Sequence, residues 1–368
     1  MKIILKIGTS SLTYKDGSLN KEYIFDFAQS AAALKALGHQ IIIITSGAIG
    51  AGMGRIKSAK PATLRQKQAL AAIGQPIIMD AYSEGFQKFG IISAQVLLTR
   101  DNFDNRGQYI NIRNTLTELL RRGIIPIINE NDAVAVEEIN FGDNDTLAAL
   151  VCASIGAEIL IVFTDVEGFY IGAPLKSKLL QKVEDITAEI ENAASEASSS
   201  KKGRGGMKTK IVAAKIAVSC GADFIIAHNS KHKFLKEIVE KKDIGTHFCA
   251  KKAGLPTKKL WIVFGKKARG RIFVDSIAAQ MIASKGKSLL AAGINGIEGK
   301  FKRGDTVNIA DNLKNDFAKG LVNFSSDELR LIKGRRSKEI KKIFPHSDEE
   351  VVHRDNLTLA AEIEAAIH

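Results

Sequence analysis

The chain has 368 residues, of which 45% are hydrophobic, and a formal net charge of +13. This length and composition can bury the core of one large domain and a smaller one. No apolar run approaches the roughly 18 residues that a membrane span needs, and the N-terminus does not have the pattern of a signal peptide, so we expect a cytoplasmic protein without membrane contact. Three scattered cysteines without metal or redox spacing argue against a disulfide framework.

The positive charge is concentrated near the C-terminus. Residues 251–345 hold 22 of the 53 basic residues but only 8 of the 40 acidic ones, so the rest of the chain is close to neutral. This asymmetry favours two domains with different roles.

Six short apolar runs alternate with longer segments over the first 250 residues. The runs lie at 2–7, 40–45, 92–99, 124–129, 158–164 and 223–227, and amphipathic helix patterns lie at 21–37 and 207–220. Continuous apolar runs are typical of parallel strands that are covered on both faces. We therefore predict an α/β domain with a mainly parallel sheet.

The pattern of apolar residues and glycines changes after about residue 257. Short runs separated by glycine turns, with a short helix near 276–284, predict a small domain of antiparallel strands such as a barrel. We expect the seam at 251–259. The serine- and glycine-rich segment 195–206 is interpreted as a mobile loop inside the first domain.

Polar loops follow four of the predicted strands, at the sheet edge where parallel sheets bind ligands. Each loop alone is equally explained by turn or N-cap chemistry. Together, their glycines and hydroxyl, carboxamide and carboxylate groups indicate phosphate binding, and phosphoryl transfer is the leading prediction. The loops are GTSS at 8–11, SGAIGAG at 46–52, END at 130–132 with GDND at 142–145, and DVEG at 165–168.

Two lysines fit this chemistry. Lys6 is the last polar residue of the first predicted strand, in a run that is otherwise apolar, so it either reaches the strand's end or lies beside bound negative charge. Lys210 lies one turn into a helix preceded by glycines, where free amides and the positive helix end converge. Lys208 competes with it but falls on another face of the helix. The stretch 203–210, GRGGMKTK, lacks the last glycine of a P-loop because Met207 stands there.

Seven motifs, in order and spacing, resemble the signatures of the glutamate 5-kinases, a group of the amino acid kinase family, and residues 270–348 resemble the PUA domain of many bacterial members. The resemblance implies a three-layer αβα sandwich over 1–257, a small mainly-β PUA-like barrel over 270–348 and a C-terminal tail over 349–368. It also implies ATP and Mg²⁺ as cosubstrates and phosphorylation of the L-glutamate side chain to L-glutamyl 5-phosphate, the first step of proline biosynthesis. The motifs are KIGTSSLT, ITSGAIGAG, LAAIGQ, IPIINENDAV, GDND, FTDVEGFY and GRGGMKTK.

The resemblance also implies the site residues, carried over motif by motif. Lys6, Lys210 and Asp145 would be catalytic, with Asp145 orienting the two lysines, and no residue would bind the metal directly because Mg²⁺ is expected on the ATP phosphates. Ser46, Asp132 and Asn144 would bind glutamate. The ATP site would comprise Lys6, Thr164, Asp165, Arg204, Gly205, Gly206, Met207, Lys208, Thr209 and Lys210.

One position departs from the family pattern, because Arg204 replaces a usual threonine of the nucleotide loop. An arginine there either tightens nucleotide binding or points into solvent, and we favour the second interpretation.

The reaction chemistry agrees with these roles. A glutamate side-chain carboxylate has an ordinary pKa near 4.3, so it is already an ionised nucleophile at neutral pH and needs no general base. The reaction needs neutralisation of the γ-phosphate charge, which Lys6, Lys210 and a magnesium ion would supply. Asp132 suits the α-ammonium of an amino acid.

Two other functions stay open. The chain could be another amino acid or nucleotide kinase of this fold, or an RNA-associated protein. The basic C-terminal region is compatible with RNA phosphates, but it has few aromatic side chains for base stacking, so RNA binding is not favoured. By analogy with the family, we expect a homo-oligomer, a dimer or a tetramer, and proline as a feedback inhibitor.

Overall fold

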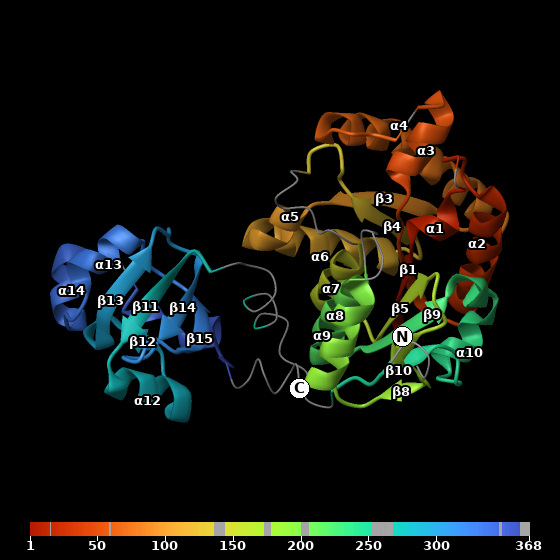
Figure 1. Cartoon of the computed structure of the whole chain (residues 1–368). Coiled ribbons are helices and arrows are strands. Elements are labelled where there is room, and N and C mark those ends of the chain that lie inside the picture. The colour runs from red at the N-terminus through yellow and green to blue at the C-terminus, as the bar shows by residue number, and fades with distance from the viewer. Residues whose placement is uncertain are drawn as a thin grey trace. The chain divides into compact units, whose positions relative to one another are not determined.

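The chain folds into two units, Met1–Gly254 and Leu255–His368 (Figure 1). This computed structural model describes all residues except 15, 59, 136–143, 173–177, 200–205, 252–258, 260–261, 263–267, 346–347 and 361–368. The predicted seam at 251–259 and the predicted domain end at 257 fall largely on residues outside this description.

An eight-stranded sheet forms the centre of the first unit. The strand order is β3-β4-β2-β1-β5-β9-β10-β8, and every neighbouring pair is parallel except β9 with β10. All six apolar runs form strands, so the mainly parallel sheet is confirmed. The strands are β1 (Lys2–Ile7), β2 (Gln40–Ile44), β3 (Ser93–Leu98), β4 (Ile125–Glu130), β5 (Ile159–Thr164), β8 (Lys182–Val183), β9 (Asp223–His228) and β10 (Thr246–Phe248).

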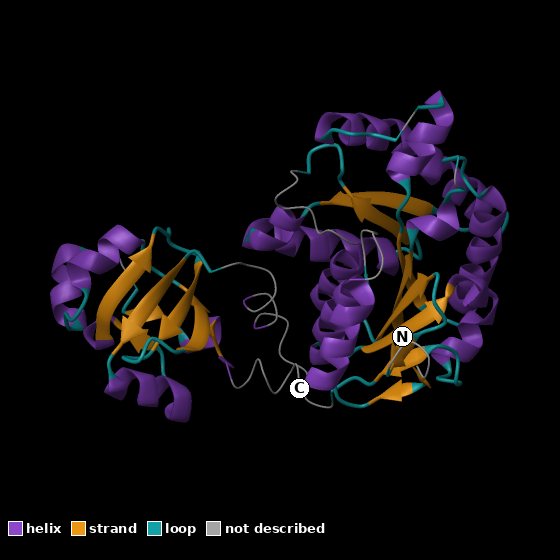
Figure 2. Ribbon diagram, in the orientation of Figure 1, coloured by secondary structure: helices purple, strands orange, loops and turns teal. Residues whose placement is uncertain are grey.

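Helices cover both faces of this sheet, as Figure 2 shows. On one face, Ile24 and Phe27 of α2 (Lys21–Ala36) belong to the same buried core as Ile3 and Leu5 of β1. On the other face, α7 (Asn144–Ile155) contacts β1, β5 and α9 (Met207–Ser219). Burial on both faces explains the continuous apolar runs, and the three-layer αβα fold is confirmed.

The remaining elements of the first unit are short segments and the helices that connect the strands. Two of them, β6 and β7, form an antiparallel hairpin. The elements are α1 (Thr9–Leu12), α5 (Arg100–Asp104), α6 (Arg106–Arg121), β6 (Phe169–Ile171), β7 (Lys178–Leu180), α8 (Ala188–Ser199), η1 (Asn229–Phe234) and α10 (Leu235–Val239).

Two glycines bring α3 (Ala48–Ile56) and α4 (Leu64–Gln87) into backbone contact. A Cβ added at Gly74 would lie 1.8 Å from the Ala48 carbonyl oxygen, and one at Gly52 would lie 2.0 Å from that of Leu70. Gly47, which precedes α3, has a φ of 91°, a conformation that residues with a Cβ rarely adopt. This close packing fixes the start of α3 directly after β2.

Gly74→Ala is expected to lower the free energy of unfolding by about 1 to 3 kcal/mol, although alanine is the better helix former, because the methyl group would push α3 and α4 apart. Thermal and denaturant unfolding would measure the change. Gly85→Ala on the same helix is the matched control, because its Cβ would lie 3.2 Å from the Ala28 Cβ. Equal effects of the two substitutions would contradict the prediction.

The second unit is built on the five-stranded sheet β13-β11-β14-β15-β17, in which β17 spans Leu357–Leu359. Its pairs are antiparallel except β11 with β14, and a separate buried core lies beneath them. The predicted helix at 276–284 is present as α12, so a second domain rich in strands is confirmed. The elements are β11 (Gly270–Val274), α12 (Ser276–Lys285), β12 (Leu289–Leu290), η3 (Ala291–Gly293), β13 (Ile294–Gly299), β14 (Thr306–Ala310), β15 (Asp316–Leu321), α13 (Ser326–Ile332) and α14 (Ser337–Ile343).

The segment predicted as a C-terminal tail, 349–368, differs from that expectation over its described part. β16 (Glu350–Val352) pairs with β12, and β17 (Leu357–Leu359) pairs with β15 after the short turn η4 (Arg354–Asn356). Val351 and Val352 are fully buried in the core of the unit. These residues therefore belong to the second unit rather than to a tail, because their apolar side chains complete its core.

None of the helices within the described residues has the length and apolar character needed to cross a membrane.

Candidate active site

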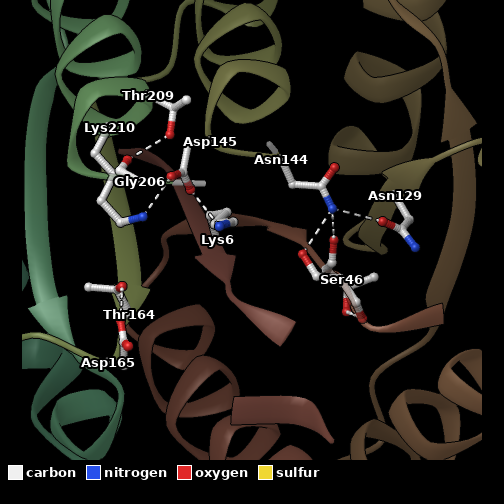
Figure 3. A network of polar contacts seen from close by, with 11 residues as sticks. Lys6, Ser46, Asn129, Asn144, Asp145, Thr164, Asp165, Gly206, Thr209 and Lys210 are labelled. Atoms are coloured by element: carbon white, nitrogen blue, oxygen red, sulfur yellow. Dashed lines mark hydrogen bonds and ion pairs between the residues drawn. The ribbon is translucent and has the colours of Figure 1, made fainter. Parts of the chain in front are cut away.

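Several polar side chains of the first unit meet at the start of α7, on the carboxyl edge of the central sheet (Figure 3). Asn144 and Asp145 are the first two residues of this helix and make different contacts. Asp145 binds two lysines from β1 and α9, whereas Asn144 binds groups that follow β2 and end β4. Helix α7 therefore supplies one residue to each of two adjoining subsites.

The first subsite is a buried carboxylate between two ammonium groups. Lys6 Nζ lies 2.5 Å from Asp145 Oδ1, and Lys210 Nζ lies 3.0 Å from Asp145 Oδ2. The side chains are 5%, 7% and 0% exposed for Lys6, Lys210 and Asp145, respectively. The structure thus brings together the three residues predicted to be catalytic. Lys6 does not reach solvent, because its ammonium group is buried beside the Asp145 carboxylate.

Among the described residues of this cluster, two lysines face one carboxylate, which leaves an excess of positive charge within that set. Charges removed from water interact strongly, so the excess charge favours an anionic ligand beside it. Both Asp145 oxygens are occupied by lysines, which makes this carboxylate unsuited to bind a metal ion at the same time. Within the residues that the structure covers, no group of three or more His, Cys, Asp or Glu side chains is arranged to hold a metal.

Helix α9 presents its N-terminus and Lys210 to the same subsite. Gly206 precedes the helix and provides no side-chain cap, and the Thr209 hydroxyl donates to the Gly206 carbonyl oxygen at 2.8 Å. Lys208 is exposed whereas Lys210 is buried, which confirms that the two lysines lie on different faces. Met207, the first residue of α9, is half-buried.

Two of the predicted nucleotide residues, Arg204 and Gly205, lie outside the described residues. The structure therefore does not test the interpretation of Arg204.

The second subsite is a cluster of hydrogen bonds around the Asn144 carboxamide. Asn144 Nδ2 donates to the Thr45 carbonyl oxygen at 2.7 Å, to Ser46 Oγ at 2.9 Å and to Asn129 Oδ1 at 3.0 Å. The Thr45 hydroxyl donates to the hydroxyl of the buried Tyr82 at 3.2 Å, and burial raises the pKa of this phenol. Ser46 and Asn144, both predicted to bind substrate, are therefore in direct contact.

The other predicted residues lie at the same sheet edge but outside these two clusters. Thr164 ends β5, and its hydroxyl donates to the carboxylate of the next residue, Asp165, at 3.1 Å. Asp132 follows β4 and lines a cavity of about 190 Å³ with Gln75 and Gln95.

Asn129 and Gln75 are site residues that the sequence analysis missed. Asn129 is 1% exposed and is the only polar residue of the apolar run 124–129, which resembles the signal that singled out Lys6. Gln75 is 7% exposed in the middle of α4 and is the last residue of the motif LAAIGQ, so its place in that motif is a sequence signal.

Two models of known protein families match this chain, one in each unit. The family model described as "Amino acid kinase family" matches residues 1–228, and the model of the PUA domain matches residues 270–344.

Curated relatives match along almost their full length. "Glutamate 5-kinase" of Thermoanaerobacter sp. (strain X514) is 44% identical, and the alignment covers 98% of each chain. "Glutamate 5-kinase" of Moorella thermoacetica is 42% identical over 97% of this chain and 95% of the relative. Among solved structures, carbamate kinase from Giardia lamblia bound to AMP-PNP aligns with 14% identity and a TM-score of 0.49, covering 68% of this chain and 98% of the other.

Proposed function

The chain belongs to the amino acid kinase family, and we propose that it is a glutamate 5-kinase, which uses ATP to phosphorylate the side-chain carboxylate of L-glutamate. The product is L-glutamyl 5-phosphate, which commits glutamate to proline synthesis. The buried cluster of Lys6, Asp145 and Lys210 is the observation that carries this proposal, because it places excess positive charge beside a subsite suited to an amino acid.

The acceptor is activated by position rather than by a base. A side-chain carboxylate is ionised at neutral pH, so the chain has to hold it in line with the γ-phosphorus and to reduce the repulsion between two anions. Lys6 and Lys210 provide positive charge for the phosphate oxygens, and Asp145 holds both ammonium groups in place. A carboxylate oxygen forms the new bond to phosphorus, and ADP leaves with the electrons of the broken bond.

The nucleotide is proposed to lie along the carboxyl ends of β1 and β5 and the N-terminus of α9. Amide groups and the positive end of a helix of 13 residues favour phosphate there. Thr164 and Asp165 would contact the rest of the nucleotide, together with the loop that precedes α9. Magnesium, when bound to the phosphates, would neutralise part of their charge.

A hydroxamate assay tests the proposed function. Full-length protein, ATP, Mg²⁺, L-glutamate and hydroxylamine should yield a glutamyl hydroxamate, because hydroxylamine traps an acyl phosphate. No hydroxamate with glutamate, but turnover with aspartate or UMP, would instead support another kinase of the same family.

Asp132→Ala is expected to raise the KM for glutamate by roughly 10- to 100-fold while the KM for ATP stays unchanged. The physical reason is that a charged hydrogen bond contributes about 1.5 to 3 kcal/mol and the carboxylate would pair with the substrate's α-ammonium. Steady-state kinetics with each substrate varied in turn would measure this. Asp80→Ala, at an exposed position of α4, is the control. A change in the KM for ATP of the same size would contradict the role of Asp132.

Several further expectations stay predictions. These are a cytoplasmic location, Mg²⁺ as the metal, a homo-oligomer and inhibition by proline at or overlapping the glutamate site. Light scattering with and without proline would measure the oligomer and any change on binding. For the PUA domain, RNA binding remains an open but disfavoured role.

A further inference from the structure

Four carboxamides form a row that leads from the proposed substrate site to α4 and β3. Asn144 Nδ2 donates to Asn129 Oδ1 at 3.0 Å, and Asn129 Nδ2 donates to Gln75 Oε1 at 2.8 Å. Gln75 Nε2 then donates to Gln95 Oε1 at 3.3 Å. Along the row, the amide nitrogens of Asn144, Asn129 and Gln75 each donate to the next carboxamide oxygen, so the row has a single direction.

Backbone groups fix that direction. The Thr45 carbonyl oxygen can only accept, so the atom of Asn144 that lies 2.7 Å from it has to be the amide nitrogen. The Glu130 N–H can only donate, so the atom of Asn129 that lies 2.9 Å from it has to be the carbonyl oxygen. Reversing either amide would place two donors or two acceptors against each other.

The direction decides what the site offers to a ligand. Both hydrogens of Asn144 Nδ2 are committed to the three oxygens around it, and Figure 3 shows Oδ1 on the opposite side of the carboxamide. Ser46 Oγ accepts from Asn144, so its own hydrogen can be donated. The pair therefore offers one acceptor, which suits an α-ammonium, and one donor, which suits a carboxylate.

We propose that Gln75 is a positioning residue, which holds Asn129 in place and thereby keeps Asn144 Oδ1 available as the acceptor for the substrate's α-ammonium. This inference rests on the proposed function. Gln75 does not contact the reacting atoms; it acts through Asn129, which is 1% exposed and has Gln75 as the acceptor for its amide nitrogen. Without that acceptor the buried amide would be left unsatisfied, and a shift of the Asn129 side chain would weaken its contact with Asn144. Asn144 would then be held by Thr45 and Ser46 alone.

The test uses the full chain and compares glutamate with glutarate, which has both carboxylates but no α-ammonium. Gln75→Met, which has similar length and no hydrogen-bonding amide, should lower kcat/KM for glutamate at least 10-fold, mostly through KM. It should leave the KM for ATP and kcat/KM for glutarate within about 3-fold of the unaltered protein. Gln75→Glu retains an oxygen for Asn129 and should keep the preference for glutamate within about 3-fold.

Gln87→Met is the matched control, because Gln87 is an exposed glutamine at the end of the same helix as Gln75, and it should leave the preference for glutamate over glutarate unchanged. A double-mutant cycle tests whether Gln75 acts through Asn129. In an Asn129→Leu background, Gln75→Met should have no further effect on the ratio of kcat/KM for glutamate to kcat/KM for glutarate. Additive effects, equal losses for glutamate and glutarate, or a changed preference in Gln75→Glu would overturn the proposal. The last result decides the matter even if Gln75→Met does not fold.

Failure of the proposed function is recognised separately. It would appear as no glutamyl hydroxamate from the unaltered protein, whereas the role of Gln75 concerns only the ratio between two acceptors in an active enzyme.

Discussion

Lys210→Ala is expected to lower the turnover number with ATP and glutamate by roughly 10²- to 10³-fold, with little change in the KM for glutamate. Lys210 lies on α9, and its Nζ donates to Asp145 Oδ2, so its positive charge is in position before any substrate binds. Charge held in place in a water-poor site costs no reorganisation when the phosphoryl group is transferred, which is why its loss should affect the rate. Rapid-quench or steady-state assays of the acyl phosphate would measure this.

Lys215→Ala provides the matched control for Lys210. Lys215 lies on the same helix and pairs with Glu191, away from Asp145, so its removal should leave turnover within about 2-fold. Lys6→Ala should have an effect similar to that of Lys210→Ala, because Lys6 binds the other oxygen of the same carboxylate. Unchanged turnover in both Lys6→Ala and Lys210→Ala would rule out the proposed mechanism.

Asp145→Asn is expected to reduce both turnover and stability. It removes the only carboxylate between Lys6 and Lys210 in the described cluster, and two buried ammonium groups would then repel each other. Breaking a buried ion pair by removing one partner costs about 3 to 5 kcal/mol. Thermal unfolding and turnover measured on the same preparation would show both losses.

ATP offers a specific check on Asp145→Asn, because phosphate charge can take the place of the lost carboxylate. The stability deficit of the variant should therefore be smaller with saturating ATP than without nucleotide. Asp185→Asn is the control, because Asp185 also pairs with a lysine, Lys251, but is well exposed. If Asp145→Asn were no less stable than Asp185→Asn, Asp145 would not be the counter-ion of a buried lysine pair.

Local patterns were sufficient to predict most of the first unit. Each of the six apolar runs became a strand. Five of them are almost fully buried, and a strand buried on both faces requires apolar residues at successive positions, whereas β3 lies at the edge of the sheet and is partly exposed. Lys6 was recognisable because a charge at the end of such a run has to be paired or to reach solvent. The final strands were missed because Val351 and Leu357 belong to runs of three residues, too short for their period to be recognised.

The row of carboxamides, in contrast, could not be predicted from local patterns in the sequence. Gln75 and Asn129 are 54 residues apart in the chain, and nothing near either residue in the sequence indicates the other. Their contact depends on the close approach of α3 and α4 through Gly52 and Gly74 and on the parallel alignment of β2 with β4.

The sequence by itself determined the class of fold, the family and the residue types at the carboxyl edge of the sheet, because strand periodicity, glycine turns and motif spacing are local properties of a chain. The family resemblance implied that Asp145 orients Lys6 and Lys210, and the tertiary structure shows the two contacts. Only the tertiary structure decided that the amide nitrogen of Asn144 is committed to Thr45, Ser46 and Asn129. These features depend on the order of the strands and on distances of a few ångströms between segments far apart in the chain, and hydrogen-bond direction and buried charge pairing are defined only once those segments are packed.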